Sequence, residues 1–149
     1  MADMGENVLE ISGESNQLRR FGEIADETIS PLSKRDPYNG EMSPSVLSFH
    51  RLYPIPDPVL AIGYNPPGGG YDWQKEHWGV KWGAADATRE QCERQLRYVF
   101  DTAWVPPIPW IEKVSCDYPL LCFELSFRDP ISNWVDEYVF QDGKQIKEE

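Results

Sequence analysis

Stretches in which apolar and polar residues alternate recur along the chain and predict several β-strands. In residues 7–12, Val8 and Glu10 fall on one side while Leu9 and Ile11 fall on the other. Because successive side chains of a strand point to opposite faces, this alternation is typical of a half-buried strand. The same pattern predicts further strands at residues 45–53, 84–90, 94–104, 120–128 and 134–141.

Two segments carry apolar residues at helical spacing instead. In the first, Leu18, Phe21 and Ile24 follow Ser15, which is a suitable N-cap residue. The second spans residues 108–118, where the prolines are confined to the first turn and are tolerated. The expected helices thus lie between expected strands along the chain. From this order we expect an α+β domain, in which two main helices cover one face of an antiparallel sheet.

The middle of the chain, residues 54–83, is rich in Pro, Gly and Trp and predicts a loop-rich insertion. Pro54, Pro56 and Pro58 end the preceding expected strand because proline cannot donate to a β-ladder. Residues 68–70 are three glycines, but no Lys-Ser or Lys-Thr follows them, so they do not match a phosphate-binding loop. We expect these glycines to form a mobile loop tip.

Length and composition indicate one domain over residues 1–149, with a core over about 7–143. The DG pair at residues 142–143 predicts a hairpin turn, and residues 144–149 are expected to fray. No apolar run is long enough for a membrane span, and the N-terminus lacks the pattern of a signal peptide. The three cysteines lack a C-x-x-C pair, which favours reduced thiols in the cytoplasm. Cys122 lies in an apolar run and is expected to be buried.

The net charge is −11, from 25 acidic and 14 basic residues. Such a balance disfavours direct binding to the phosphate backbone, which depends on Lys and Arg, and it favours a basic partner. An acidic surface that serves only solubility is the plain alternative.

Candidate catalytic chemistry is sparse. His50 lies among apolar residues and is interpreted as structural, whereas His77 lies beside Glu76 in the Trp-rich segment. No recognisable nucleophile or metal-ligand motif accompanies His77. Asp86, Glu90 and the neighbouring acids are interpreted as a solvated face. No metal or cofactor is indicated, and the chain is not expected to be an enzyme.

The densest feature is the aromatic and charged segment at residues 71–83. Trp78 and Trp82, flanked by glycine, are interpreted as core residues, with interface anchors as the alternative, and Trp73 is expected to be exposed. Stacking of single-stranded nucleic acid on these aromatics is a further alternative. The predicted partner-binding residues are Tyr71, Asp72, Trp73, Lys75, Glu76, His77 and Lys81.

Several of these stretches also resemble a known family. Residues 78–82 read WGVKW, residues 100–107 read FDTAWVPP, and Tyr118-Pro119 precedes an aromatic strand pair. This pattern resembles the ferredoxin-like domain of YubB-type proteins, which are carried by phages, prophages and plasmids and have no assigned activity. The resemblance covers residues 7–143. It implies a ferredoxin-like core with added strands, a mobile-element origin in a bacterial host, and no catalytic residues.

Three hypotheses for function follow. The first is a phage or mobile-element accessory protein that binds a host or phage protein and inhibits a host defence system such as a CRISPR effector, its acidic surface imitating nucleic acid. The second is a single-stranded nucleic-acid-binding module that uses Trp73, Trp78 and Lys81. The third is an enzyme that uses His77 with a carboxylate.

Overall fold

The computed structural model describes residues 3–28, 45–65 and 67–146, and its main feature is one six-stranded antiparallel sheet. The strand order is β2-β3-β1-β4-β5-β6. The strands are β1 Met4–Ser12, β2 Ala85–Gln91, β3 Gln95–Ala103, β4 Cys122–Arg128, β5 Val135–Gln141 and β6 Lys144–Ile146.

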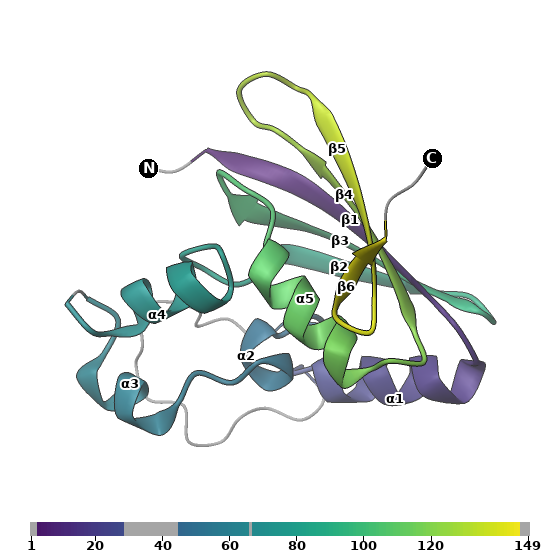
Figure 1. Cartoon of the computed structure of the whole chain (residues 1–149), viewed down its shortest axis with the longest axis horizontal. Coiled ribbons are helices and arrows are strands. Elements are labelled where there is room, and N and C mark those ends of the chain that lie inside the picture. Colours follow the sequence, from purple (N-terminus) through teal and green to yellow (C-terminus); the bar gives the residue numbers. More distant parts are fainter. Residues whose placement is uncertain (1–2, 29–44, 66, 147–149) are drawn as a thin grey trace.

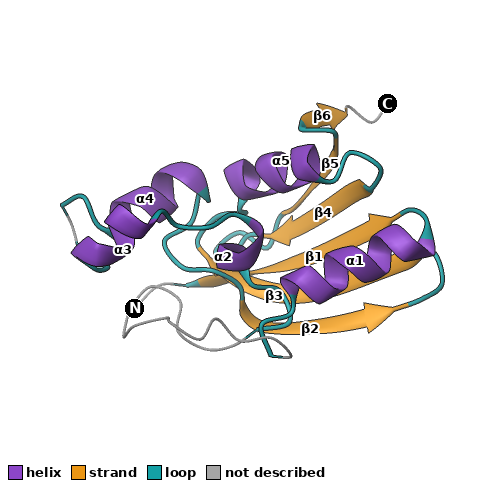
Figure 2. Ribbon diagram, turned by 90° about the horizontal axis from the view of Figure 1, so that it is seen from below, coloured by secondary structure: helices purple, strands orange, loops and turns teal. Residues whose placement is uncertain are grey.

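The five helices of the described residues lie on one side of this sheet (Figures 1 and 2). The two longest, α1 Ser15–Ala25 and α5 Ile108–Asp117, pack across the strands, and α2 Phe49–Leu52 lies between them. The helices α3 Asp57–Ile62 and α4 Gly70–His77 follow α2 at one end of the helical layer. The units β1-α1-β2-β3-α5-β4 give the ferredoxin-like βαββαβ order, so the expected α+β class is confirmed. Strands β5 and β6 extend the sheet beyond β4.

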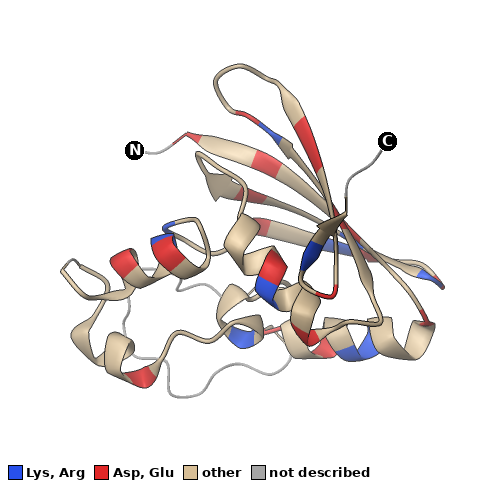
Figure 3. Ribbon diagram, viewed as in Figure 1, with Lys and Arg blue, Asp and Glu red and all other residues tan. Residues whose placement is uncertain are grey.

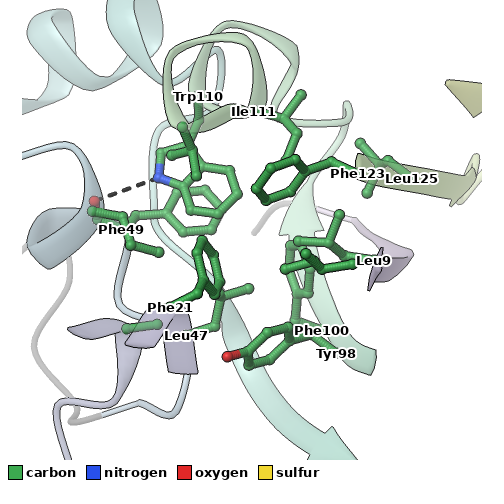
Figure 4. Close-up of a cluster of buried hydrophobic side chains, with 14 of the residues drawn as sticks. Leu9, Phe21, Leu47, Phe49, Tyr98, Phe100, Trp110, Ile111, Phe123 and Leu125 are labelled. Carbon is green, nitrogen blue, oxygen red and sulfur yellow. Dashed lines mark hydrogen bonds between the residues drawn. The ribbon is translucent and has the colours of Figure 1, made fainter. Parts of the chain in front are cut away.

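The core fills the space between the sheet and the helices (Figure 4). In β3 the expected alternation is confirmed, because Leu96, Tyr98 and Phe100 are buried while the residues between them are not. The ring of Trp110 on α5 stacks on Phe49 at 3.9 Å between centroids. The Trp110 indole also donates to the Phe49 carbonyl oxygen at 3.4 Å. This contact fastens the segment between α1 and β2 to the sheet domain.

The strand expected at residues 45–53 is wrong, because residues 49–52 form helix α2. Ser48 caps this helix by accepting a hydrogen bond from the Arg51 backbone N–H at 3.2 Å. Phe49 and Leu52 are both buried, at the spacing of one helical turn. His50 therefore lies on a helix, and its Nδ1 accepts from the Ile55 N–H at 2.9 Å, which agrees with a structural role.

Two expectations about loops and ends also need correction. Gly69 and Gly70 are buried, and a Cβ on Gly69 would lie 2.5 Å from the Gly63 carbonyl oxygen, so the glycines close a tight turn and are not a loop tip. Gly68 alone is exposed. The tail expected to fray contributes β6 through Ile146, because the predicted turn at Asp142 and Gly143 returns the chain to pair with β5. Both turn residues have positive φ, as this kind of turn requires.

Candidate functional site

Six of the seven predicted partner-binding residues lie on helix α4, and Lys81 lies in the turn that follows it. Asp72, Lys75 and Glu76 are exposed, whereas the others are half-buried. The Asp72 carboxylate accepts from the Gly68 N–H at 2.8 Å and so holds the start of the helix. The helix thus gathers these residues on one element, and their role in binding stays a prediction.

The aromatic residues of this segment are engaged in packing. Trp78 is fully buried, as expected for a core residue, and its indole donates to the Tyr53 carbonyl oxygen at 3.0 Å. Trp73 was expected to be exposed, but it is half-buried and packs against the core. Trp82 is half-buried, not fully buried, and the Lys81 ammonium lies 4.6 Å from the centre of its ring. The glycines that flank Trp78 and Trp82 did not distinguish these three environments.

His77 also serves this packing. Its ring stacks on Trp73 at 4.5 Å between centroids, and its Nδ1 lies 3.0 Å from the Trp73 carbonyl oxygen. The edge of Tyr53 covers the pair from another side. One nitrogen and one face of the imidazole are therefore used inside α4. Among the described residues, no group of three or more His, Cys, Asp or Glu is arranged to hold a metal ion.

A second surface, which no local sequence pattern indicates, is the face of the sheet turned away from the helices. We call it the open face. On β1 the buried residues Asn7, Leu9 and Ile11 face the helices, so the residues between them face outward. The strand register extends this division across the sheet. The acidic side chains of the open face are Glu6, Glu10, Glu90, Asp101, Glu124 and Glu137, and its basic ones are Arg97, Arg128 and Lys144.

Acidic residues lie opposite one another on this face. Glu10 on β1 is the direct partner of Glu124 on β4. Glu6 is the direct partner of Asp101 on β3. Like charges opposite each other destabilise an antiparallel pair. Figure 3 shows the acidic positions along several strands of the sheet.

The basic side chains of the open face neutralise part of this charge. Arg97 lies 3.5 Å from the Glu10 carboxylate and 3.8 Å from that of Glu90, so one guanidinium is shared by two acids. Near the start of β1, Arg128 on β4 is the direct partner of Glu6. Glu124 and Glu137 are both exposed on strands that extend the acidic surface beyond β1.

Asp101 shows the effect of this arrangement on a carboxyl group. Burial raises the pKa of Asp101 above its ordinary value, and the neighbouring charges of Asp86 and Glu6 raise it further. The ionised form of Asp101 is therefore less stable in the folded protein than in the unfolded chain, and a positive charge placed nearby would stabilise it.

All three cysteines lie in the described part of the chain and are free; Cys122 was expected to be buried but is half-buried on the open face. Burial raises the pKa of the Cys122 thiol, and the charge of Glu124 adds to that effect. Within the described residues, no helix has the length and apolar character needed to cross a membrane.

Comparisons with known proteins agree with the fold. Residues 77–148 match a family model described as a ferredoxin-like domain in Api92-like protein. The crystal structure of protein api92 from Yersinia pseudotuberculosis is similar to the whole chain, with a TM-score of 0.66 and 10% sequence identity, over 98% of this chain and 96% of that one. A likeness at this identity shows the fold alone. No curated protein matches the chain.

These matches confirm the ferredoxin-like part of the expected resemblance, whereas the YubB type and the phage or plasmid origin stay predictions. The family description names a fold and no reaction. The segment from residue 77, at the end of α4, through β6 is thus similar to the ferredoxin-like domain of Api92-like proteins.

Proposed function

We propose that this protein acts by binding another protein that has a basic surface, and that it does so through the open face of its sheet. The observation that carries the proposal is that acids oppose each other in two pairs, Glu10 with Glu124 and Glu6 with Asp101. Each pair lowers the stability of the free protein. A cationic partner seated on the face would relieve this repulsion, so binding and folding stability depend on the same carboxylates.

The chemistry of the partner follows from the charge of the surface. Proteins that hold nucleic acid in a positively charged channel present clustered Lys and Arg, and an acidic sheet would compete for such a channel. A CRISPR effector of a bacterial host is one protein of this kind and is a candidate target. The proposal of a mobile-element accessory protein that inhibits host defence rests on this complementarity and on the resemblance to YubB-type proteins.

Direct binding of single-stranded nucleic acid has less support. Trp78 is fully buried, and one face of Trp73 is covered by His77, so neither ring is free to stack on a base on both sides. The open face would repel a phosphate backbone. Filter binding with a single-stranded oligonucleotide tests this alternative. We expect the filter to retain no more oligonucleotide with the protein than without it.

A pull-down from bacterial lysate at low salt tests the proposal when three forms of the bait are compared. The first is the wild type, and the second carries Glu10→Gln and Glu124→Gln on the open face. The third carries Glu23→Gln and Glu112→Gln on the helical side, as a matched charge control.

We expect basic proteins to be captured by the wild type and the helical-side control, released by moderate salt, and lost from the open-face variant. Capture of the same proteins by the open-face variant would refute the role of this face. A fourth bait with Lys75→Ala and Glu76→Ala tests α4, and selective loss with this bait would move the site to that helix.

A further inference from the structure

Exposed apolar side chains gather at one end of the sheet, where β1 begins. The β4–β5 loop exposes Ile131 and Trp134, with 69% and 75% of their surfaces accessible, and Val135 follows at the start of β5. Trp104 and Val105, which follow β3, are exposed as well. We call these five residues the apolar end. Exposed apolar side chains that gather in one region mark interaction sites in soluble proteins.

Backbone pairing places the two segments on either side of the first residues of β1. The Trp104 N–H donates to the Asp3 carbonyl oxygen at 3.0 Å, so Trp104 continues the pairing of β3 with β1. On the other side of β1, Arg128 is the partner of Glu6, and the β4–β5 loop starts directly after Arg128. The apolar end therefore adjoins the open face, which contains Glu6.

The β4–β5 loop is held in one shape by its own hydrogen bonds. The Asp129 carboxylate accepts from the N–H groups of Ile131 and Ser132, at 2.8 and 3.0 Å. The Ser132 hydroxyl oxygen accepts from the Trp134 N–H at 3.2 Å. These backbone donors lower the pKa of Asp129, which keeps its negative charge beside the apolar side chains. A loop ordered before binding loses little conformational entropy when a partner arrives.

We infer that the apolar end is the anchor point for a polypeptide partner that presents an apolar side chain flanked by Lys or Arg. Tryptophan is enriched among the few residues that dominate binding energy at protein interfaces. Charge complementarity selects the flanking residues, because the carboxylates of Glu6, Asp101 and Asp129 lie at this end of the sheet and outnumber the Arg128 guanidinium there. The inference rests on the proposed function: the open face attracts the basic partner, and Trp134 with Ile131 fixes where it binds.

A displayed library of random linear peptides, selected against the immobilised chain, provides the probe. The selected peptides are then synthesised and titrated against Trp134→Ala and Ile131→Ser. Leu120→Ser is the matched control, because Leu120 is as exposed as Ile131 at 69% but lies outside the apolar end. Circular dichroism and thermal melting of each variant establish that it is folded.

We expect the selected peptides to combine an aromatic or aliphatic residue with Lys or Arg. Their affinity should fall about 30-fold with Trp134→Ala, which is the size of an interface hot spot, and should be unchanged with Leu120→Ser. We expect Trp134→Phe, which keeps an aromatic ring, to retain most of the affinity for these peptides.

Four results would overturn the inference: no peptide above background, peptides without basic residues, equal affinity for Trp134→Ala and wild type, or a dimer that Trp134→Ala converts to a monomer. The last result would make a second copy of the chain the occupant. Peptides that lose affinity for the open-face variant but keep it for Trp134→Ala would leave the proposed function standing and refute only the anchor.

Discussion

The opposed carboxylates of the open face predict a substitution that raises stability and lowers binding. Glu124→Gln removes one member of the pair with Glu10 and keeps a side chain of similar size and strand propensity. Directly opposed residues of an antiparallel pair lie about 5 Å apart, and two unit charges at that distance in water repel by about 0.8 kcal/mol. Arg97 already offsets part of the Glu10 charge, so we expect a gain of about 0.5 kcal/mol.

For a chain of this length, that gain corresponds to a rise in melting temperature of about 1–2 °C. Glu124→Lys, which replaces repulsion with attraction, should gain about twice as much. Thermal melting followed by circular dichroism measures both. The gain should shrink as salt is raised, because the Debye length falls to about 3 Å at 1 M ionic strength.

Glu137→Gln is the control for this measurement. It removes the same charge from the same face, but Glu137 lies opposite Ser126, which carries no charge. Its melting temperature should therefore change less than that of Glu124→Gln. Equal shifts for the two variants, or a lower melting temperature for Glu124→Gln at low salt, would refute the assignment of the strain to the Glu10–Glu124 pair.

Three further outcomes are expected, each measured by urea denaturation. Trp110→Ala removes a fully buried ring stacked on Phe49 and should lower the free energy of unfolding by about 3–5 kcal/mol, whereas Trp110→Phe should lose much less. Ser48→Ala removes the cap of α2 and should lower it by about 1 kcal/mol. Asp101→Asn should raise it at neutral pH by less than about 1 kcal/mol, since solvent screens this group.

The pH dependence of the Asp101→Asn effect has a definite sign. Because the folded-state pKa of Asp101 is raised, the folded protein takes up this proton before the unfolded chain does, and its penalty for holding the charge is present above the raised pKa. The difference between Asp101→Asn and wild type should therefore diminish as the pH falls through that pKa and vanish below the ordinary carboxyl range. A difference that grows on acidification would contradict the raised pKa.

The elements with long, regular alternation were predictable from the sequence. From Leu96 to Phe100 in β3 and from Phe123 to Phe127 in β4, every second residue is large and apolar, and a strand with one buried face imposes that period. The helices at residues 15–25 and 108–117 likewise follow their apolar spacing. The strand prediction for residues 45–53 was wrong because four helical residues are too few to distinguish a period of 3.6 from one of two. Ser48, a good N-cap residue three positions before Arg51, was the available signal.

The candidate site was much harder to predict, since it depends on strand register. The Trp-rich segment stood out because its residues are neighbours in sequence, and the structure uses most of them for packing. Glu10 and Glu124 are far apart in the chain and meet only because β4 pairs with β1 in one register. A shift of β4 by one residue would turn Glu124 toward the helices and leave Glu10 without this partner. Local composition contains no information about that choice.

Unfavourable local conformations are also concentrated at the end of the sheet where the open face meets the apolar end. Trp104 and Asn133 have positive φ, although neither is glycine, and Trp104 is a bulky exposed residue for which this conformation is costly. Asp86, the third such residue there, lies at the irregularity where β2 pairs with β3 beside Asp101. Sequences agree with their folds at most positions, and departures gather where function requires them. The opposed Glu6 and Asp101, the exposed tryptophans and the unfavourable backbone angles lie at one end of one sheet. This combination favours a binding role over a surface that serves solubility, because solubility requires only the charge.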